Sequence, residues 1–263
     1  MWAIEAPGGV RLLSTADAGV PAPDRIAVGT GAGEVVVYDR TTGEQVGDPI
    51  AFAASWAEVE GDLLITGAAD ADPSDGCAAT VAAYRIGEAE PLWEAETATR
   101  ASFDGEQCAP APHDIAEGLM PLSPGGTPTV VDVATGESVW TGDEPAQALA
   151  VAEGTAATAS WELGPDNFSG YDLATGQLQW RTTAAIESSA VIHPIGSTLW
   201  MTTLIDDVRD LHTVRAVGLR TGEVVTVPGE KAEFRGDRVL TFVGEPTRDH
   251  PAGRYAWAGD LWK

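Results

Sequence analysis

The chain is poor in basic residues and cysteine, and it has no long apolar run. Against 40 acidic residues it has 15 basic ones, and it has two cysteines. No stretch approaches the roughly 18 consecutive apolar residues that a membrane-spanning helix needs. The formal charge of −25 would repel phosphates, which argues against nucleic acid and anionic membranes as partners. Basic proteins, cations and neutral ligands remain.

Familiar catalytic patterns are also missing. The pair His113 and Asp114 has the residue types of a general base and its orienting acid, but no Gly-x-Ser-x-Gly nucleophile elbow accompanies it. The other histidines, His193, His212 and His250, show no metal-ligand spacing. No phosphate-binding glycine loop is present, and with 40 acids neighbouring carboxylates are expected by chance. The sequence therefore identifies no catalytic residue.

What the chain does contain is a repeated phrase. The segment Val131–Trp140, VDVATGESVW, recurs as Tyr171–Trp180, YDLATGQLQW, and shorter copies begin at Tyr38 and Val217. One residue per copy divides the chain into units of about 40 to 50 residues, the period of solenoids and propellers. These residues are Trp2, Val46, Trp93, Trp140, Trp180, Val225 and Trp262, which define repeats of approximately 2–46, 47–93, 94–140, 141–180, 181–225 and 226–263. We expect them to form a single domain.

Between these residues the apolar runs are short and bounded by Gly, Pro and Asp, which indicates strands rather than helices. The runs include Arg25–Val28, Glu34–Tyr38, Asp62–Ile65, Thr198–Thr203 and Arg238–Val243. About four strands per unit at this period predict the blades of a β-propeller, in which each sheet buries both faces against its neighbours. We therefore predict an all-β propeller of four-stranded antiparallel blades with six repeats visible. It is either a closed six-bladed ring or part of a seven- or eight-bladed one.

The repeated Asp-x-x-Thr-Gly segment is expected to be a tight turn between strands c and d of a blade, with strands named a to d from the centre outward. Its Asp can accept hydrogen bonds from the turn's own amides, and its Gly supplies a positive φ. The Trp or Val that follows would wedge between adjacent blades, each indole burying roughly 150–250 Å². The predicted structural turn residues are Asp39, Gly43, Asp132, Gly136, Asp172, Gly176 and Gly222.

The segments Asp132–Trp140 and Asp172–Trp180 resemble the tryptophan-docking motif of the pyrroloquinoline-quinone-like repeat family. The resemblance covers nearly the whole chain and implies a propeller. That family includes quinoprotein dehydrogenases, outer-membrane assembly scaffolds and extracellular proteins without a cofactor. The dehydrogenases carry two adjacent cysteines beside the quinone, whereas Cys77 and Cys108 lie far apart in this sequence, and two repeats have Val at the docking position. We therefore expect no pyrroloquinoline quinone, and calcium is the one ion that stays a candidate.

The two cysteines are predicted to lie on the same face of neighbouring blades. Loops from strand b to strand c, and connections from strand d to the next strand a, emerge opposite the repeated turns. Cys77 ends such a b-to-c loop in the second repeat, and Cys108 lies in the connection to the third. We predict a disulfide between them, which implies an oxidising compartment. Two unrelated buried thiols are the alternative.

The same assignment gathers acidic residues on that face, which we call the acidic loop face. They are Asp70, Asp72, Asp75, Asp166, Asp206, Asp207, Asp210 and Asp249. We expect this face to bind a basic protein or a cation, although polar, solvated loop tips would have the same composition. The segment Asp70–Gly76 partly follows a calcium loop, but its Gly is one place late and Val81 stands where a bidentate Glu is needed.

These observations predict a non-enzymatic, extracellular or cell-envelope propeller that binds, scaffolds or senses through the acidic loop face. Any signal peptide or anchor is expected to lie outside this sequence. The alternative is an enzyme, either a degenerate quinoprotein or a hydrolase with its site in the central channel. Titratable groups with perturbed pKa values converging in one pocket would indicate the enzyme. A purely structural spacer would show neither feature.

Overall fold

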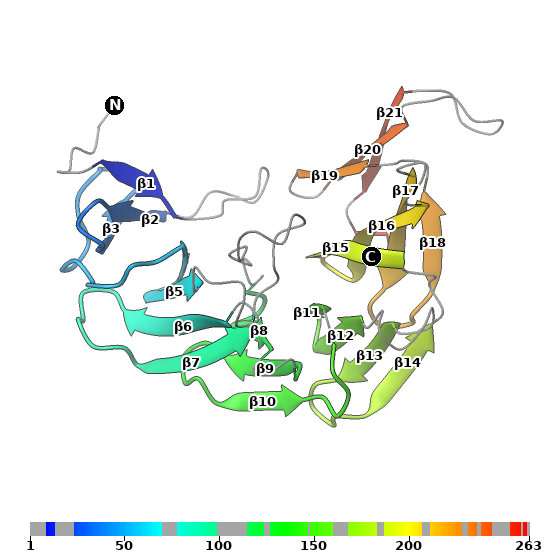
Figure 1. The fold of residues 1–263 in the computed structure, drawn as a ribbon, viewed down its shortest axis with the longest axis horizontal. Helices are drawn as coiled ribbons and strands as arrows, with labels where there is room; N and C mark the ends of the chain where they lie inside the picture. Colours follow the sequence, from blue (N-terminus) through cyan, green and yellow to red (C-terminus); the bar gives the residue numbers. More distant parts are fainter. Residues whose placement is uncertain are drawn as a thin grey trace.

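The structure is a computed structural model, and it describes residues 9–13, 24–69, 78–98, 115–123, 127–146, 148–159, 168–182, 187–206, 211–227, 231–235, 238–243, 253–258 and 260–261. The described residues form β-strands and no helix. The strands make six antiparallel sheets, each built from strands that are consecutive in the sequence (Figure 1). The predicted β-propeller fold is confirmed. No helix in this part of the chain is long and apolar enough to cross a membrane.

The first three sheets occupy the N-terminal half. Sheet 1 consists of β1 (Val10–Leu12), β2 (Arg25–Thr30) and β3 (Val35–Asp39). Sheet 2 consists of β4 (Trp56–Glu60), β5 (Leu63–Ala69), β6 (Ala78–Arg85) and β7 (Trp93–Ala98). Sheet 3 consists of β8 (Leu119–Leu122), β9 (Thr129–Asp132) and β10 (Ser138–Thr141).

The other three sheets follow in the C-terminal half. Sheet 4 consists of β11 (Ala148–Ala152), β12 (Thr155–Ala159), β13 (Phe168–Asp172) and β14 (Leu178–Thr182). Sheet 5 consists of β15 (Glu187–Ile195), β16 (Thr198–Asp206), β17 (Leu211–Gly218) and β18 (Val224–Val227). Sheet 6 consists of β19 (Lys231–Arg235), β20 (Arg238–Val243) and β21 (Gly253–Ala258).

Among the described residues, sheets 2, 4 and 5 have the four strands that were predicted and sheets 1, 3 and 6 have three. In sheet 1 the outer place is taken by an irregular segment that makes only isolated bridges, from Gln45 to Tyr38 and from Ile50 to Val35. This segment contains Gly47 and Pro49. Because proline has no N–H to donate and glycine weakens a strand, the outer strand of this blade is not regular.

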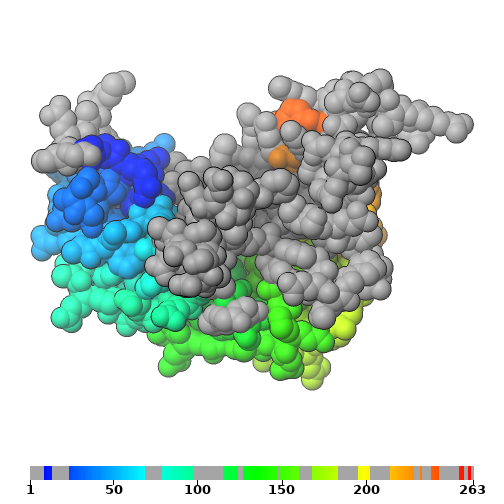
Figure 2. Space-filling model, in the orientation of Figure 1, coloured from blue at the N-terminus to red at the C-terminus, as the bar shows by residue number. Residues whose placement is uncertain are grey.

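The sheets follow one another along a curved arc, with sheet 1 at one end and sheet 6 at the other (Figure 1). In the space-filling view the blue residues of sheet 1 and the orange residues of sheet 6 stand on opposite sides of an indentation in the molecular outline (Figure 2). Each blade therefore packs mainly on the blades before and after it in the sequence, as in other repeat architectures.

The described residues form five hydrophobic clusters, and each cluster joins two neighbouring sheets. Successive residues of a strand point to opposite faces of its sheet. In β5, for example, Leu64 packs in the cluster shared with sheet 1, and the next residue, Ile65, packs in the cluster shared with sheet 3. In β16, Leu199 packs toward sheet 4 and Trp200 toward sheet 6. The middle sheets thus bury both faces.

Candidate functional site

The turns from strand c to strand d have the same construction in four blades. Their glycines, Gly43, Gly136, Gly176 and Gly222, have φ angles of 76°, 71°, 71° and 68°. Each glycine N–H donates to the carbonyl oxygen of the residue four places earlier, at 2.7–2.8 Å. A φ near +70° is readily available to glycine but strained for other residues. The repeated glycine therefore sets the geometry of the turn that follows strand c.

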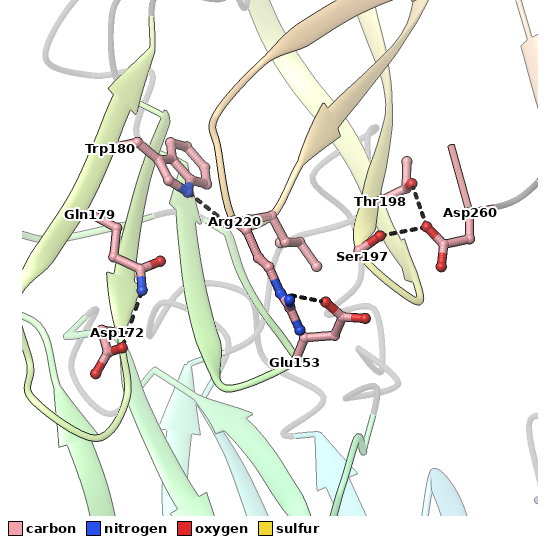
Figure 3. A network of polar contacts seen from close by, with 9 residues as sticks. Glu153, Asp172, Gln179, Trp180, Ser197, Thr198, Arg220 and Asp260 are labelled. Carbon is pink, nitrogen blue, oxygen red and sulfur yellow. Dashed lines mark hydrogen bonds and ion pairs between the residues drawn. The ribbon is translucent and has the colours of Figure 1, made fainter. Parts of the chain in front are cut away.

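The Asp that opens three of these turns accepts hydrogen bonds from the turn itself. Asp172 Oδ1 accepts from the N–H and the hydroxyl of Thr175, each at 2.8 Å. Asp172 Oδ2 accepts from Gln179 Nε2 at 3.1 Å (Figure 3). Asp132 Oδ1 accepts from the N–H of Thr135 at 2.9 Å and from its hydroxyl at 3.0 Å. These carboxylates are engaged in holding their own turns.

The same bonds lower the pKa of two of these carboxyls. The Thr175 hydroxyl is the main cause for Asp172, followed by the N–H of Thr175, and together they hold the pKa of Asp172 below its ordinary value of 3.8. For Asp39 the main cause is instead the backbone N–H of Thr42, which lowers the pKa of that carboxyl from the same value. Both side chains are charged at neutral pH.

In sheets 2, 3 and 4 an indole of strand d packs on the turn of the next blade. Trp93 Nε1 donates to the carbonyl oxygen of Val133 at 2.8 Å. A methyl group on Gly136 would lie 2.5 Å from Cγ of Trp93, so the turn glycine is also needed for this close approach. At the next junction Trp140 packs with Leu173 in the turn of sheet 4. At the one after it, Trp180 Nε1 donates to Leu219 O at 2.6 Å (Figure 3).

The register shows how valine replaces tryptophan at this docking position in sheet 5. Trp180 pairs with Gly170 across a β-bulge, whereas Val225 pairs with Ala216 in a continuous ladder. The bulge adds one residue between the turn and the docking position, which accounts for the different spacing in the sequence. Trp180 is 8% exposed, and Val225 is 38% exposed.

The first junction, between sheets 1 and 2, and the last, between sheets 5 and 6, are held by other contacts. Between sheets 1 and 2, Gly47 approaches Gly87 so closely that a methyl group on Gly47 would overlap the Gly87 backbone. Between sheets 5 and 6, Asp260 Oδ1 accepts from Ser197 Oγ at 2.5 Å and from Thr198 Oγ1 at 3.3 Å (Figure 3). Asp260 cannot be recognised from the sequence, because its partners are 62 and 63 residues away and no local pattern connects them.

A groove of about 540 Å³ opens among the turns of sheets 3, 4 and 5. Val139, Leu173 and Asp172 line it, together with Glu153 and Arg220, whose Oε2 and Nε atoms lie 3.0 Å apart (Figure 3). Its wall is therefore partly apolar, and its charged groups include an ion pair and a carboxylate engaged in its own turn. In the part of the chain that the structure describes, no three His, Cys, Asp or Glu side chains form a group that could hold a metal ion.

Titratable groups with shifted pKa values do not converge among the described residues. Asp39 lies in sheet 1, Tyr84 in sheet 2, Asp172 in sheet 4 and Arg215 in sheet 5. Burial is the main cause of the raised pKa of Tyr84 and the cause of the lowered pKa of Arg215. Each shift thus has a local structural cause.

Most of the residues predicted for the acidic loop face lie outside the described residues. Asp206 is the exception, because its backbone is described: it is the last residue of β16 and pairs with Leu211. The predicted disulfide between Cys77 and Cys108 also lies outside. The other seven residues of this face also lie outside the described part of the chain; they are Asp70, Asp72, Asp75, Asp166, Asp207, Asp210 and Asp249.

The strands that flank these loops are described, and they fix where each loop begins and ends. In sheets 2, 4, 5 and 6 the loops join strand b to strand c. The last described pair of each hairpin stands at the beginning of strand c, whereas the repeated turns follow the end of strand c. These pairs are Ala69 with Ala79, Ala159 with Phe168, Asp206 with Leu211, and Val243 with Gly253.

No protein-family model matches this sequence, and no curated protein matches it either. Solved structures match most of the chain. A eukaryotic initiation factor has a TM-score of 0.66 at 12% identity, over 98% of this chain and 64% of its own. BamB from Moraxella catarrhalis has a TM-score of 0.54 at 16% identity, over 94% of this chain and 77% of its own.

The computationally designed protein Ika8 is similar as well, with a TM-score of 0.51 at 16% identity over 92% of this chain and 70% of its own. Identities this low establish the fold alone. The chain is a β-propeller, and its similarity to the quinone-type repeats in particular rests on the docking motif.

Proposed function

We propose that this propeller is a non-enzymatic binding or scaffold module that works outside the cytoplasm, with the acidic loop face as its docking surface. The observation that carries the proposal is the common placement of the four b-to-c hairpins, whose described ends all stand at the beginning of strand c. The sequences between those ends contain the acidic residues defined above. A basic protein or a cation is the partner that such a surface would attract.

The contrast between the two faces supports this choice. The opposite face carries the repeated turns, and we call it the turn face. Its carboxylates accept hydrogen bonds from their own turns; they are Asp39, Asp132 and Asp172. A carboxylate used in this way has fewer lone pairs left for a partner. Carboxylates gathered around one rim would reinforce each other's potential and speed the approach of a basic partner. Because exposed charges are screened over about 8 Å at physiological ionic strength, that effect should weaken with salt.

A non-enzymatic role is supported by the described residues whose pKa values are shifted, because they lie in four different sheets. An active site would be expected to gather such groups in one pocket. Propellers host many unrelated functions, so the fold itself does not choose between binding and catalysis. Equilibration with pyrroloquinoline quinone and calcium provides a direct check, and we expect neither quinone binding nor oxidation of alcohols or sugars.

An extracytoplasmic location rests on the predicted disulfide between Cys77 and Cys108. Closing a loop of about 30 residues would stabilise the folded state by roughly 3–4 kcal/mol in the chain-entropy model. Mass spectrometry of a non-reduced digest should find the two cysteine peptides joined. Two free thiols in protein purified without reductant would contradict both the cross-link and the location drawn from it.

Binding to the acidic loop face is tested by replacing Asp206, Asp207 and Asp210 with Asn together. The probes are calcium alone and a synthetic oligolysine peptide, measured by calorimetry at several salt concentrations. We expect the triple variant to bind either calcium or the oligolysine peptide more weakly, and its binding to depend less on salt. Asp132→Asn is the control, and it should lower thermal stability without affecting binding. The opposite pattern would show that the turn face is the docking surface.

A further inference from the structure

We propose that the outer strand of sheet 5, β18, is a second interaction site. It would pair with an extended, positively charged segment of a partner protein, which would become an additional strand of this sheet. The inference goes beyond the proposed function because it concerns the outer edge of one blade and not the acidic loop face. It can hold or fail independently of that proposal.

The comparison with the outer strands of other blades points to β18. Edge strands have unpaired N–H and C=O groups, and proteins protect them with charged residues or bulges. The outer strand β7 contains Glu94 and Glu96, and β14 contains Arg181 and a bulge. The outer strand β10 has a bulge. Among these four described outer strands, β18 alone has neither feature: its sequence is Val-Val-Thr-Val, and its register with β17 is continuous.

The hydrogen-bonding pattern identifies the groups that would receive a partner. Gly218 N donates to the carbonyl oxygen of Glu223 at 2.9 Å, where the hairpin of β17 and β18 begins. Hydrogen-bonded and non-hydrogen-bonded pairs alternate along an antiparallel ladder. The alternation directs the N–H and C=O of Val225 toward β17 and those of Val224 and Thr226 away from it. In the described part of the sheet, β18 pairs with β17 alone.

The side chains of β18 suit a partner in the extended conformation. Val225 is 38% exposed at the register position where Trp140 and Trp180 are 7% and 8% exposed, and the neighbouring Thr226 is exposed as well. An added strand would cover part of Val225. Cross-strand pairs of β-branched residues stabilise such pairing.

Size and charge determine the partner. The surface that a four-residue edge can bury is far smaller than the roughly 1,200–2,000 Å² buried in a stable protein–protein interface. The edge therefore does not provide a dimer interface by itself. Two copies would also repel each other, because each has a formal charge of −25. The same charge attracts a cationic segment, and the exposed Glu223 lies immediately before the strand. Strand addition of a basic peptide is the recognition mode that fits these conditions.

Hydrogen exchange detected by mass spectrometry tests the proposal directly. The probe is a synthetic peptide of alternating valine and threonine with a lysine at each end. We expect it to slow exchange at the amides of Val224 and Thr226, while the inward amide of Val225 is protected already. A peptide with N-methylated backbone amides, or one with glutamate at each end, should have a weaker effect. No added protection of β18 by the lysine peptide would overturn the proposal.

A pair of proline variants separates the outward from the inward amides. Thr226→Pro removes an outward N–H at an edge position that tolerates proline, and we expect it to weaken peptide binding by about three- to tenfold without loss of folding. Val225→Pro removes an inward N–H and should instead destabilise sheet 5. Val225→Lys adds a positive charge to the edge and should also weaken binding of the lysine peptide.

Two further results would contradict the proposal. If Thr226→Pro binds the peptide as tightly as the original protein, the probe is held elsewhere. If sedimentation shows a dimer that Thr226→Pro abolishes, the occupant is a second copy and not a basic partner. The triple Asp206, Asp207 and Asp210 to Asn variant keeps β18 intact and should retain peptide-induced protection of its amides. Failure of the acidic loop face and failure of the β18 site are therefore distinguishable.

Discussion

The junctions in the middle of the arc and those at its ends are closed by different interactions. From sheet 2 to sheet 5, an indole of one blade packs on the turn of the next, and Trp93 and Trp180 also approach the turn glycine closely. At the first junction two glycines meet, and at the last junction Ser197 and Thr198 hold Asp260. Apolar clusters lie at the middle and at the end junctions, but only the middle ones add a docked indole, whose place is taken at the ends by backbone contact or hydrogen bonds among the described residues. Because repeat proteins are stabilised by nearest-neighbour interfaces, we expect stability to decrease toward the ends.

The largest effect should come from removing an indole in the middle. Trp180→Ala is expected to lower the free energy of unfolding by about 3–5 kcal/mol, because it leaves a cavity and removes the bond to Leu219 O. Val225→Ala is the matched change at the same register position in the next blade, and it should lower that free energy by less than about 1 kcal/mol because Val225 is partly exposed. Urea denaturation of both variants checks the comparison, and equal losses would contradict it.

The turn glycines allow a second comparison in which the backbone angle is constant. Gly176 and Gly222 have nearly the same positive φ, so alanine introduces similar backbone strain of about 1–2 kcal/mol at either site. A methyl group on Gly222 would lie 2.7 Å from Cδ2 of Trp180, whereas on Gly176 the nearest atom of Trp140 would be 4.0 Å away. We therefore expect Gly222→Ala to be the more destabilising change by about 1–3 kcal/mol. Thermal denaturation of the two variants measures this difference, which isolates the indole contact.

The fold could be predicted because its determinants are local and repeated. Short apolar runs indicated β2, β3, β5, β16 and β20, and all five are strands. The repeated Asp-x-x-Thr-Gly phrase indicated a turn that each blade forms from its own residues, as the bonds between Asp172 and Thr175 show. The irregular outer segment of sheet 1 differs from the prediction. Val46 stands at the docking position, but Gly47 and Pro49 after it prevent a regular strand.

The candidate surfaces could be predicted less completely, because they depend on contacts between distant segments. The hydrogen bonds of Asp260 cross more than 60 residues of sequence. The exposure of Val225 depends on the register of β18 and on the absence of a bulge, which the sequence alone does not reveal. The acidic loop face stays a prediction, because seven of its eight residues lie outside the described part of the chain.

The last junction provides a smaller test of the difference between middle and ends. Asp260→Ala removes the acceptor of two hydroxyl groups and should lower the free energy of unfolding by about 1–2 kcal/mol. Asp260→Asn keeps an acceptor oxygen and should cost less. Hydrogen exchange should show that Asp260→Ala loosens β19, β20 and β21 more than β11 to β14. Uniform loosening of all sheets would mean that the end junction is as strongly coupled to the rest as the middle ones.

The smallest effect concerns the turns themselves, where Asp172 and Asp39 have lowered pKa values for different reasons. The Thr175 hydroxyl is the main cause at Asp172, whereas the Thr42 backbone N–H is the main cause at Asp39. Thr175→Val should therefore raise the pKa of Asp172 toward 3.8, and Thr42→Val should shift Asp39 less, because valine keeps the N–H. Carboxyl chemical shifts followed by NMR during an acid titration measure both values.

The effect on stability has a definite sign. A carboxyl whose pKa is lower in the folded state than in the unfolded state stabilises the protein above the unfolded value, and this contribution is lost as pH falls through the lowered folded value. Thr175→Val should thus reduce the loss of stability on acidification from about pH 5 downward, and Thr42→Val should reduce it less. If the two substitutions changed the pKa values of Asp172 and Asp39 equally, the Thr175 hydroxyl would not be the main cause of the lowered pKa of Asp172.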